Sequence, residues 1–118
     1  MPRTLSSTAR HKRHKKVLKQ AKGFRGSRKN LYRQATNAVD RAMAMAYTGR
    51  KQKKRQYRRL WTTRINAACR NNGMTYSDFI HGLKTANIDL NRKALAAMAV
   101  QDPEEFAELV DTARKAIA

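Results

Sequence analysis

The sequence predicts an all-α protein that consists of a basic N-terminal tail, one very long helix over about residues 31–71, and a small helical C-terminal domain. Apolar residues recur three and four positions apart after residue 30, which is the period of one face of an α-helix. Strand signals are absent. The charge is divided as well: residues 1–59 contain 20 Lys and Arg but one acid, Asp40, whereas residues 60–118 contain seven basic and seven acidic residues. The net charge of +19 therefore lies entirely in the first half of the chain.

The basic tail comprises residues 1–29 and contains few apolar side chains. Such a segment cannot bury enough apolar surface to offset the entropy that is lost on ordering. We therefore expect it to be largely disordered when the protein is alone in water. Residues 9–22 are expected to form a short helix once an anionic partner neutralises their charge.

The long helix is predicted from two apolar stripes with a basic segment between them. Gly49 lies in its interior and costs about 1 kcal/mol relative to alanine, which is not enough to break a helix that is supported on both sides. Asn72-Gly73 supplies the stop signal. The stripes are formed by Leu31, Ala35, Ala38, Val39, Ala42, Met43, Ala46 and Tyr47, and by Leu60, Trp61, Ile65, Ala68 and Cys69.

Three short helices are expected to follow and to pack with the end of the long helix. Thr75 begins the first, with Asp78 three positions later as in a capping box. Asp89 or Asn91 begins the second, and Asp102 caps the third before a proline at its first position. The apolar positions expected to face the core are Tyr76, Phe79, Ile80, Leu83, Leu90, Ala94, Leu95, Met98, Phe106, Leu109, Val110, Ala113 and Ile117.

No catalytic or metal site is predicted. The sequence has no phosphate-binding glycine loop, paired-carboxylate site or nucleophile–base set. His11 and His14 lack the further ligands that a metal site requires, and the apolar neighbours of Cys69 favour a small buried side chain over a nucleophile. We therefore expect no enzyme activity, cofactor or metal ion, and no run of apolar residues is long enough to predict a membrane span.

The basic segments instead predict a nucleic-acid partner. Helices that merely face solvent interleave acids with their cations, and these segments do not. RNA is favoured over DNA because Arg outnumbers Lys in residues 1–59 and aromatic rings lie among the cations, and both groups stack on unpaired bases. The predicted RNA-binding residues are Arg3, Arg10, His11, Lys12, Arg13, His14, Lys15, Lys16, Lys19, Lys22, Phe24, Arg25, Arg28, Lys29, Tyr32, Arg33, Arg50, Lys51, Lys53, Lys54, Arg55, Tyr57, Arg58 and Arg59, with Arg92 and Lys93 of the C-terminal domain.

The division of charge between the two halves predicts a basic RNA-binding extension over residues 1–59 and a globular helical domain over residues 60–118. The alternative from another class is an architectural protein that compacts duplex DNA through its charge alone. That alternative predicts equal affinity for any duplex of the same length, because phosphate contacts position a protein and read little sequence.

Four segments are specific enough to identify a family: KQAKGFRG (19–26), RLWTTRINAA (59–68), YSDFIHGLK (76–84) and LNRKALAAMAVQDP (90–103). They resemble the L-twenty family of bacterial-type large-subunit ribosomal proteins, and the resemblance covers essentially the whole chain. It implies a structural constituent of the large ribosomal subunit that binds large-subunit rRNA directly and promotes early subunit assembly.

The resemblance also implies where the protein is found and what it meets there. Its partners would be large-subunit rRNA and neighbouring large-subunit ribosomal proteins, with no membrane and no homo-oligomer. The location would be a cytoplasmic ribosome, with an organellar ribosome as the alternative. In some bacteria the C-terminal domain of such proteins also represses translation of its own operon.

Overall fold

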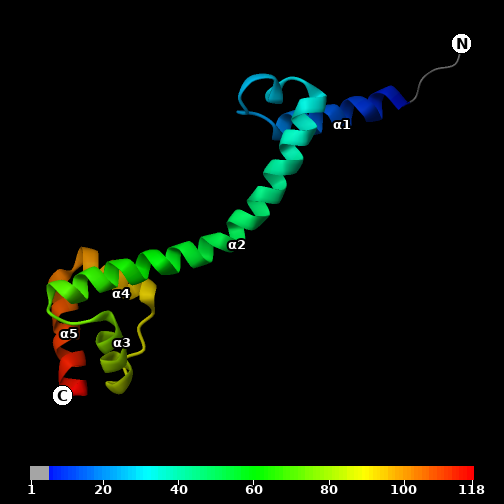
Figure 1. Ribbon diagram of the computed structural model, residues 1–118. Helices are drawn as coiled ribbons and strands as arrows, with labels where there is room; N and C mark the ends of the chain where they lie inside the picture. The colour runs from blue at the N-terminus through cyan, green and yellow to red at the C-terminus, as the bar shows by residue number, and fades with distance from the viewer. Residues whose placement is uncertain (1–5) are drawn as a thin grey trace, which may run out of the picture. The chain divides into compact units, whose positions relative to one another are not determined.

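The computed structural model describes residues 6–118 and is all-α over that range, as predicted (Figure 1). In chain order the elements are α1 (Ser6–Gln20), the short 3-10 helix η1 (Gly26–Lys29), α2 (Tyr32–Asn71), α3 (Tyr76–Thr85), α4 (Arg92–Gln101) and α5 (Pro103–Ile117). They belong to two compact units, Met1–Lys51 and Gln52–Ala118, whose boundary falls inside α2. The functional boundary after residue 59 was drawn from charge and stays a prediction.

The tail contains a small apolar cluster that was not expected from the sequence. Ala21, just after α1, is fully buried together with Ala35 of α2, and Val39 is nearly so. The side chains packed against these three are Val17, Leu18 and Phe24. The short helix predicted over residues 9–22 is present as α1 with bounds Ser6–Gln20. Arg3, which was predicted to bind RNA, lies outside the described residues.

Helix α2 confirms the predicted long helix, because its bounds differ from the expected 31–71 by one residue. Gly49 lies inside it without interrupting it. Beyond Ala42 the rest of the first apolar stripe is exposed, since Met43 and Tyr47 are 52% and 56% exposed, and Met45 beside them is 67% exposed. Every residue from 43 to 60 is exposed, so this part of α2 depends on intrinsic helix propensity until something binds it.

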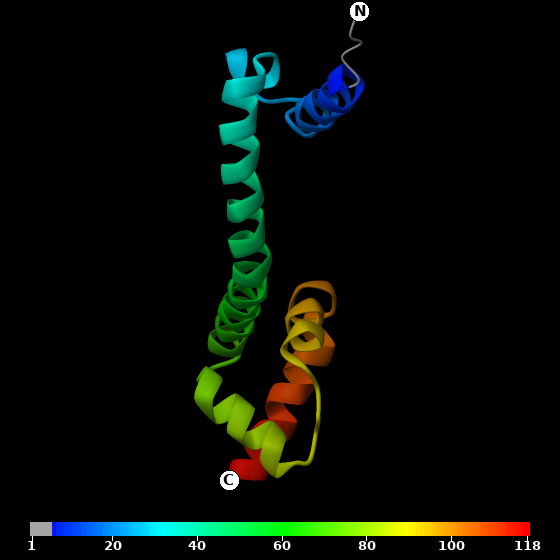
Figure 2. The same cartoon turned by 90° about the vertical axis from the view of Figure 1, so that its right-hand side faces the viewer.

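The core of the C-terminal unit forms where α5 packs against both α3 and α4 (Figure 2). Phe79 of α3 and Phe106 of α5 are buried with ring centroids 5.2 Å apart and planes inclined by 43°, which is a favourable tilted arrangement. Ile65 and Cys69 from the end of α2 complete this core, and Trp61 packs against its edge.

Local signals at the helix ends act largely as predicted. The Asp78 backbone N–H donates to the Thr75 hydroxyl at 3.2 Å, and that hydroxyl donates to the Asp78 carboxylate at 2.7 Å. The Asn91 side chain accepts from the Ala94 N–H at 2.8 Å and so begins α4. Asp102 differs from the prediction, because its side chain forms no capping hydrogen bond. Its backbone N–H donates to the Met98 carbonyl at 2.9 Å, so this residue also ends α4 and does not adopt a capping conformation.

Candidate nucleic-acid interface

The first feature of the candidate interface is a set of cations that have no acidic partners. Every Lys and Arg between residues 10 and 59 is exposed. Within residues 6–118 the one ion pair joins Arg114 Nη1 to Asp111 Oδ1 at 3.3 Å, far along the chain from these cations. Unpaired cations at this density repel one another. An anion that binds them lowers this repulsion and so stabilises the fold of residues 10–59.

On α1, the predicted binding residues are exposed except for His14. The His14 imidazole stacks on the Tyr32 ring with centroids 3.7 Å apart and planes inclined by 14°, and both residues are half-buried. These two predicted RNA-binding side chains therefore contact each other and join α1 to the start of α2. The predicted stacking of Tyr32 on RNA bases would have to use the face of its ring that His14 leaves open.

The basic segment of α2, residues 50–59, presents cations all around the helix. Arg50, Lys54 and Arg58 follow one another at intervals of four residues, which places like charges on one face. Lys51 Nζ lies 4.7 Å from the centroid of the Tyr47 ring, and Lys53 Nζ lies 5.8 Å from that of Tyr57. These cation–π contacts hold some ammonium groups along the helix without neutralising their charge.

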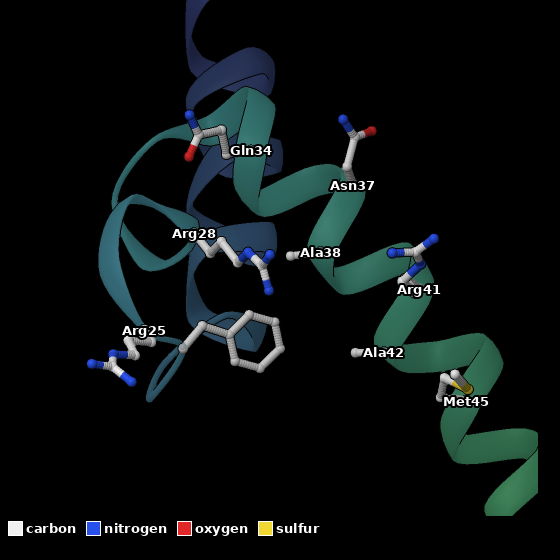
Figure 3. Close-up of a pocket in the computed structure, with 9 residues that line it drawn as sticks. Arg25, Arg28, Gln34, Asn37, Ala38, Arg41, Ala42 and Met45 are labelled. Atoms are coloured by element: carbon white, nitrogen blue, oxygen red, sulfur yellow. The ribbon is translucent and has the colours of Figure 1, made fainter.

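A cavity of about 840 Å³ lies between the loop after α1 and the first turns of α2 (Figure 3). Phe24, Arg25 and Arg28 line it from the loop. On α2 it is bordered by residues between Gln34 and Met45, and three of these, Gln34, Asn37 and Arg41, were not predicted to bind RNA. Their spacing of three and four residues could have indicated a shared helix face, but no pattern in the sequence shows that the loop returns to that face.

In the C-terminal unit, the two predicted cations differ in their surroundings. Arg92 is half-buried, and its Nε donates to the Tyr76 hydroxyl at 2.9 Å, so part of its guanidinium joins α4 to α3. Lys93 is exposed. Arg114 was not predicted to bind, and its Nη2 donates to the Asn72 carbonyl at 2.7 Å, where it caps the end of α2. Lys93 is thus the freer of the two candidates for a nucleic-acid contact.

Chemistry of other kinds finds little support in the described residues. No group of three or more His, Cys, Asp or Glu side chains in residues 6–118 could hold a metal ion. In the same part of the chain, no helix is both long and apolar enough to cross a membrane. Burial raises the pKa of the Cys69 thiol from 9.0 to about 11. A thiol in that state is a poor nucleophile, because the thiolate is the reactive form.

Native Cys69 is therefore expected to react slowly with iodoacetamide at pH 8 and rapidly after unfolding in urea. The thiol keeps its proton in the fold up to a pH of about 11, whereas the unfolded thiol loses it near 9.0. The contribution of this burial to stability is thus complete below pH 9 and is lost as the pH rises toward 11. Mass spectrometry of the alkylated chain measures the rate without ambiguity, because Cys69 is the only cysteine. Equal rates in buffer and in urea would contradict the buried placement.

The chain is similar to known proteins over nearly its whole length. The family model described as "Ribosomal protein L20" matches residues 3–109. A "Large ribosomal subunit protein bL20" of Natranaerobius thermophilus is 56% identical over 117 residues, which are 99% of this chain and 100% of that protein. The protein of the same name from Elusimicrobium minutum is 58% identical over 95% of this chain and 95% of its own length. The one from Agathobacter rectalis is 53% identical over 100% of this chain and 100% of its own length. The chain belongs to the ribosomal protein L20 family.

Proposed function

We propose that this protein is a structural constituent of the large ribosomal subunit, that it binds large-subunit rRNA directly, and that it promotes early assembly of the subunit in the cytoplasm. Family membership supports the ribosomal location. The observation that supports RNA binding most strongly is that every Lys and Arg from residue 10 to 59 is exposed and lacks an acidic partner. A polyanion is the partner that such a surface requires.

The mechanism follows from the physics of phosphate binding. Each Lys or Arg that neutralises a phosphate releases condensed counterions, and this release drives association in a way that weakens as salt rises. Such contacts fix position and carry little sequence information. Specificity must then come from the shape of the RNA, because a helix as long as α2 fits only where RNA segments leave a matching groove. Neutralising several RNA segments at once would hold them together, which is how binding would promote assembly.

The two parts of the chain would have different tasks. Residues 1–59 would neutralise and join RNA segments, and residues 60–118 would orient the protein through a folded surface that includes Lys93. Neighbouring proteins of the large subunit would complete the surroundings. Repression of its own operon through the C-terminal domain stays a prediction from the family resemblance alone.

The test is a comparison of three targets: a large-subunit rRNA fragment, random RNA of equal length, and duplex DNA. The salt should be high enough to suppress non-specific phosphate contacts. We expect the chain to keep a preference for the rRNA fragment under these conditions. Equal affinity for all three targets would instead favour the architectural DNA-compacting alternative.

The same assay separates the tasks of the two parts through matched charge variants. Replacing Lys54 and Arg58 by Gln removes two phosphate contacts. The slope of log affinity against log salt concentration is expected to become less steep by about 1.4 to 1.8, because each contact contributes about 0.7 to 0.9 to it. Replacing Lys84 and Lys115, which are exposed cations of residues 60–118, by Gln serves as the control. A similar loss of slope in both variants would contradict the division of tasks.

A further inference from the structure

The cavity beside the loop after α1 has walls of two chemical kinds. Its apolar part includes the half-buried Phe24, the small side chains of Ala38 and Ala42, and Met45. Its polar residues include Arg28 and Arg41. No carboxylate lines the cavity, and Asp40, the only acid of residues 1–59, is not among its lining residues. A ligand for this site therefore needs a flat apolar surface joined to an anion.

The side chains in Figure 3 place these two kinds of wall relative to each other. Arg28 extends from the loop toward Ala38, whereas Arg25 points away from α2. Arg28 is thus the cation that reaches into the space between loop and helix, and Arg25 lies at its margin. Neither guanidinium forms an ion pair within residues 6–118. Ala38 and Ala42 leave room on the helix side, since larger residues there would fill it.

In the structure, the loop that forms one wall is fixed by its own backbone contacts. Gly23 and Gly26 have φ values of 86° and 67°, a left-handed conformation that residues with a Cβ rarely adopt. Between them, the Phe24 N–H donates to the Ala21 carbonyl at 3.1 Å, and Ala21 is fully buried in the tail cluster. An ordered wall lowers the entropy lost on binding, so a ligand of matching shape gains affinity.

We infer that this cavity holds one unstacked nucleotide of the bound RNA strand, with its base against Phe24 and the Ala38–Ala42 floor and its phosphate beside Arg28. A nucleotide is the unit of RNA that joins a flat aromatic surface to an anion, and folded RNA presents unstacked bases that proteins capture on aromatic and arginine side chains. The volume of about 840 Å³ lies within the usual range for small-ligand sites. This inference rests on the proposed function and adds to it a point of recognition that charge alone does not provide.

A nucleotide within a strand fits this site better than a free nucleotide. Lys22, Lys29 and Arg33 are exposed and lie within two positions of lining residues in the chain, so they would contact the flanking phosphates of a strand. A free nucleotide has no flanking phosphates and would lose those contacts. The experiment therefore includes adenosine monophosphate as a competitor, to separate the two sources.

The test compares two substitutions of the same kind in α2 of the full chain. Ala42→Leu fills the floor of the cavity, whereas Ala46→Leu places the same side chain one turn further on, at an exposed position that does not line the cavity. Both variants keep every charge and use a good helix former. We expect Ala42→Leu to weaken high-salt binding to the large-subunit rRNA fragment roughly 5- to 100-fold, the range for loss of one stacked base. Ala46→Leu should bind like the unmodified chain.

Further readouts identify what occupies the cavity. Phe24→Ala should weaken binding to a similar degree as Ala42→Leu, and circular dichroism shows whether this variant keeps its helices, since Phe24 also packs on the tail cluster. Neither variant should lower the slope of the salt dependence by more than about 0.7, the contribution of the one phosphate beside Arg28, because every cation is kept. Ultraviolet cross-linking should attach a single nucleotide to the peptide that contains Phe24. Competition by millimolar adenosine monophosphate is expected to be absent.

The outcomes separate this inference from the proposed function. If the unmodified chain prefers the rRNA fragment but Ala42→Leu and Ala46→Leu bind equally well, the nucleotide site is wrong and the proposed function stands. Strong competition by the free nucleotide would also overturn the inference in favour of a small-molecule site. If the unmodified chain shows no preference for rRNA, the proposed function itself fails.

Discussion

Gly82→Ala is expected to destabilise the C-terminal unit by about 2 kcal/mol or more. Gly82 is buried in α3 against α5, and a Cβ at this position would lie 2.8 Å from the Ala113 Cβ and 2.9 Å from its carbonyl carbon, and closer still to the carbonyl oxygen. Because the obstruction includes backbone, the two helices would have to separate, and overpacking of this kind typically costs about 1–3 kcal/mol and occasionally more. Urea unfolding followed by circular dichroism measures the change.

Gly49→Ala is the matched control for this prediction. Gly49 also lies inside a helix, but a Cβ there would meet nothing within 4 Å. The same substitution should therefore stabilise α2 by about 0.5–1 kcal/mol through helix propensity alone. Opposite signs at the two glycines are the expected result. If Gly82→Ala were as favourable as Gly49→Ala, the close approach of α3 and α5 would be wrong.

Phe79→Ala is expected to cost about 3–5 kcal/mol, the usual range for removing a buried phenylalanine. Phe79 is fully buried and its ring contacts that of Phe106, so the substitution removes apolar burial and an aromatic pair together. The stability of a unit of this size is about 3–10 kcal/mol. The variant should therefore unfold at a much lower urea concentration than the unmodified chain, which the fluorescence of Trp61 would report, since it is the only tryptophan and packs on this core.

Val100→Ala provides the comparison for the loss of Phe79. Val100 lies in α4 of the same unit but is 63% exposed, so its truncation removes little buried surface. Its effect should stay within about 0.5 kcal/mol. A loss at position 100 as large as that at position 79 would show that the core is not where the structure places it.

The helices themselves could be predicted because their signals are local. The period of apolar residues located α2 to within one residue, and the Thr75 and Asn91 caps began α3 and α4 where expected. The buried face of α4 was less accurate: Leu95 is buried as predicted, but Ala96 takes the core position expected for Ala94. An alanine-rich helix offers several equivalent faces, and only the packing of α5 selects one.

The parts that could not be predicted depend on contacts between distant residues. The predicted stripe on α2 contained Ala35 and Val39, but nothing in the sequence shows that the tail folds back to bury them. For the same reason Phe24 was predicted to be free for RNA stacking, whereas one side of it already packs on the tail cluster. The common cavity that Gln34, Asn37 and Arg41 line exists only because the loop after α1 lies beside them.

The exposed middle of α2 has a consequence for the lifetime of the protein in the cell. From residue 50 to 59 the chain offers a dense series of bonds after Lys and Arg, and no tertiary packing protects them. Proteases cleave where the backbone opens locally, and an unpacked helix opens more readily than a core. A copy that remained unassembled would therefore be cut within residues 50–59. A copy bound to its partner would be shielded there.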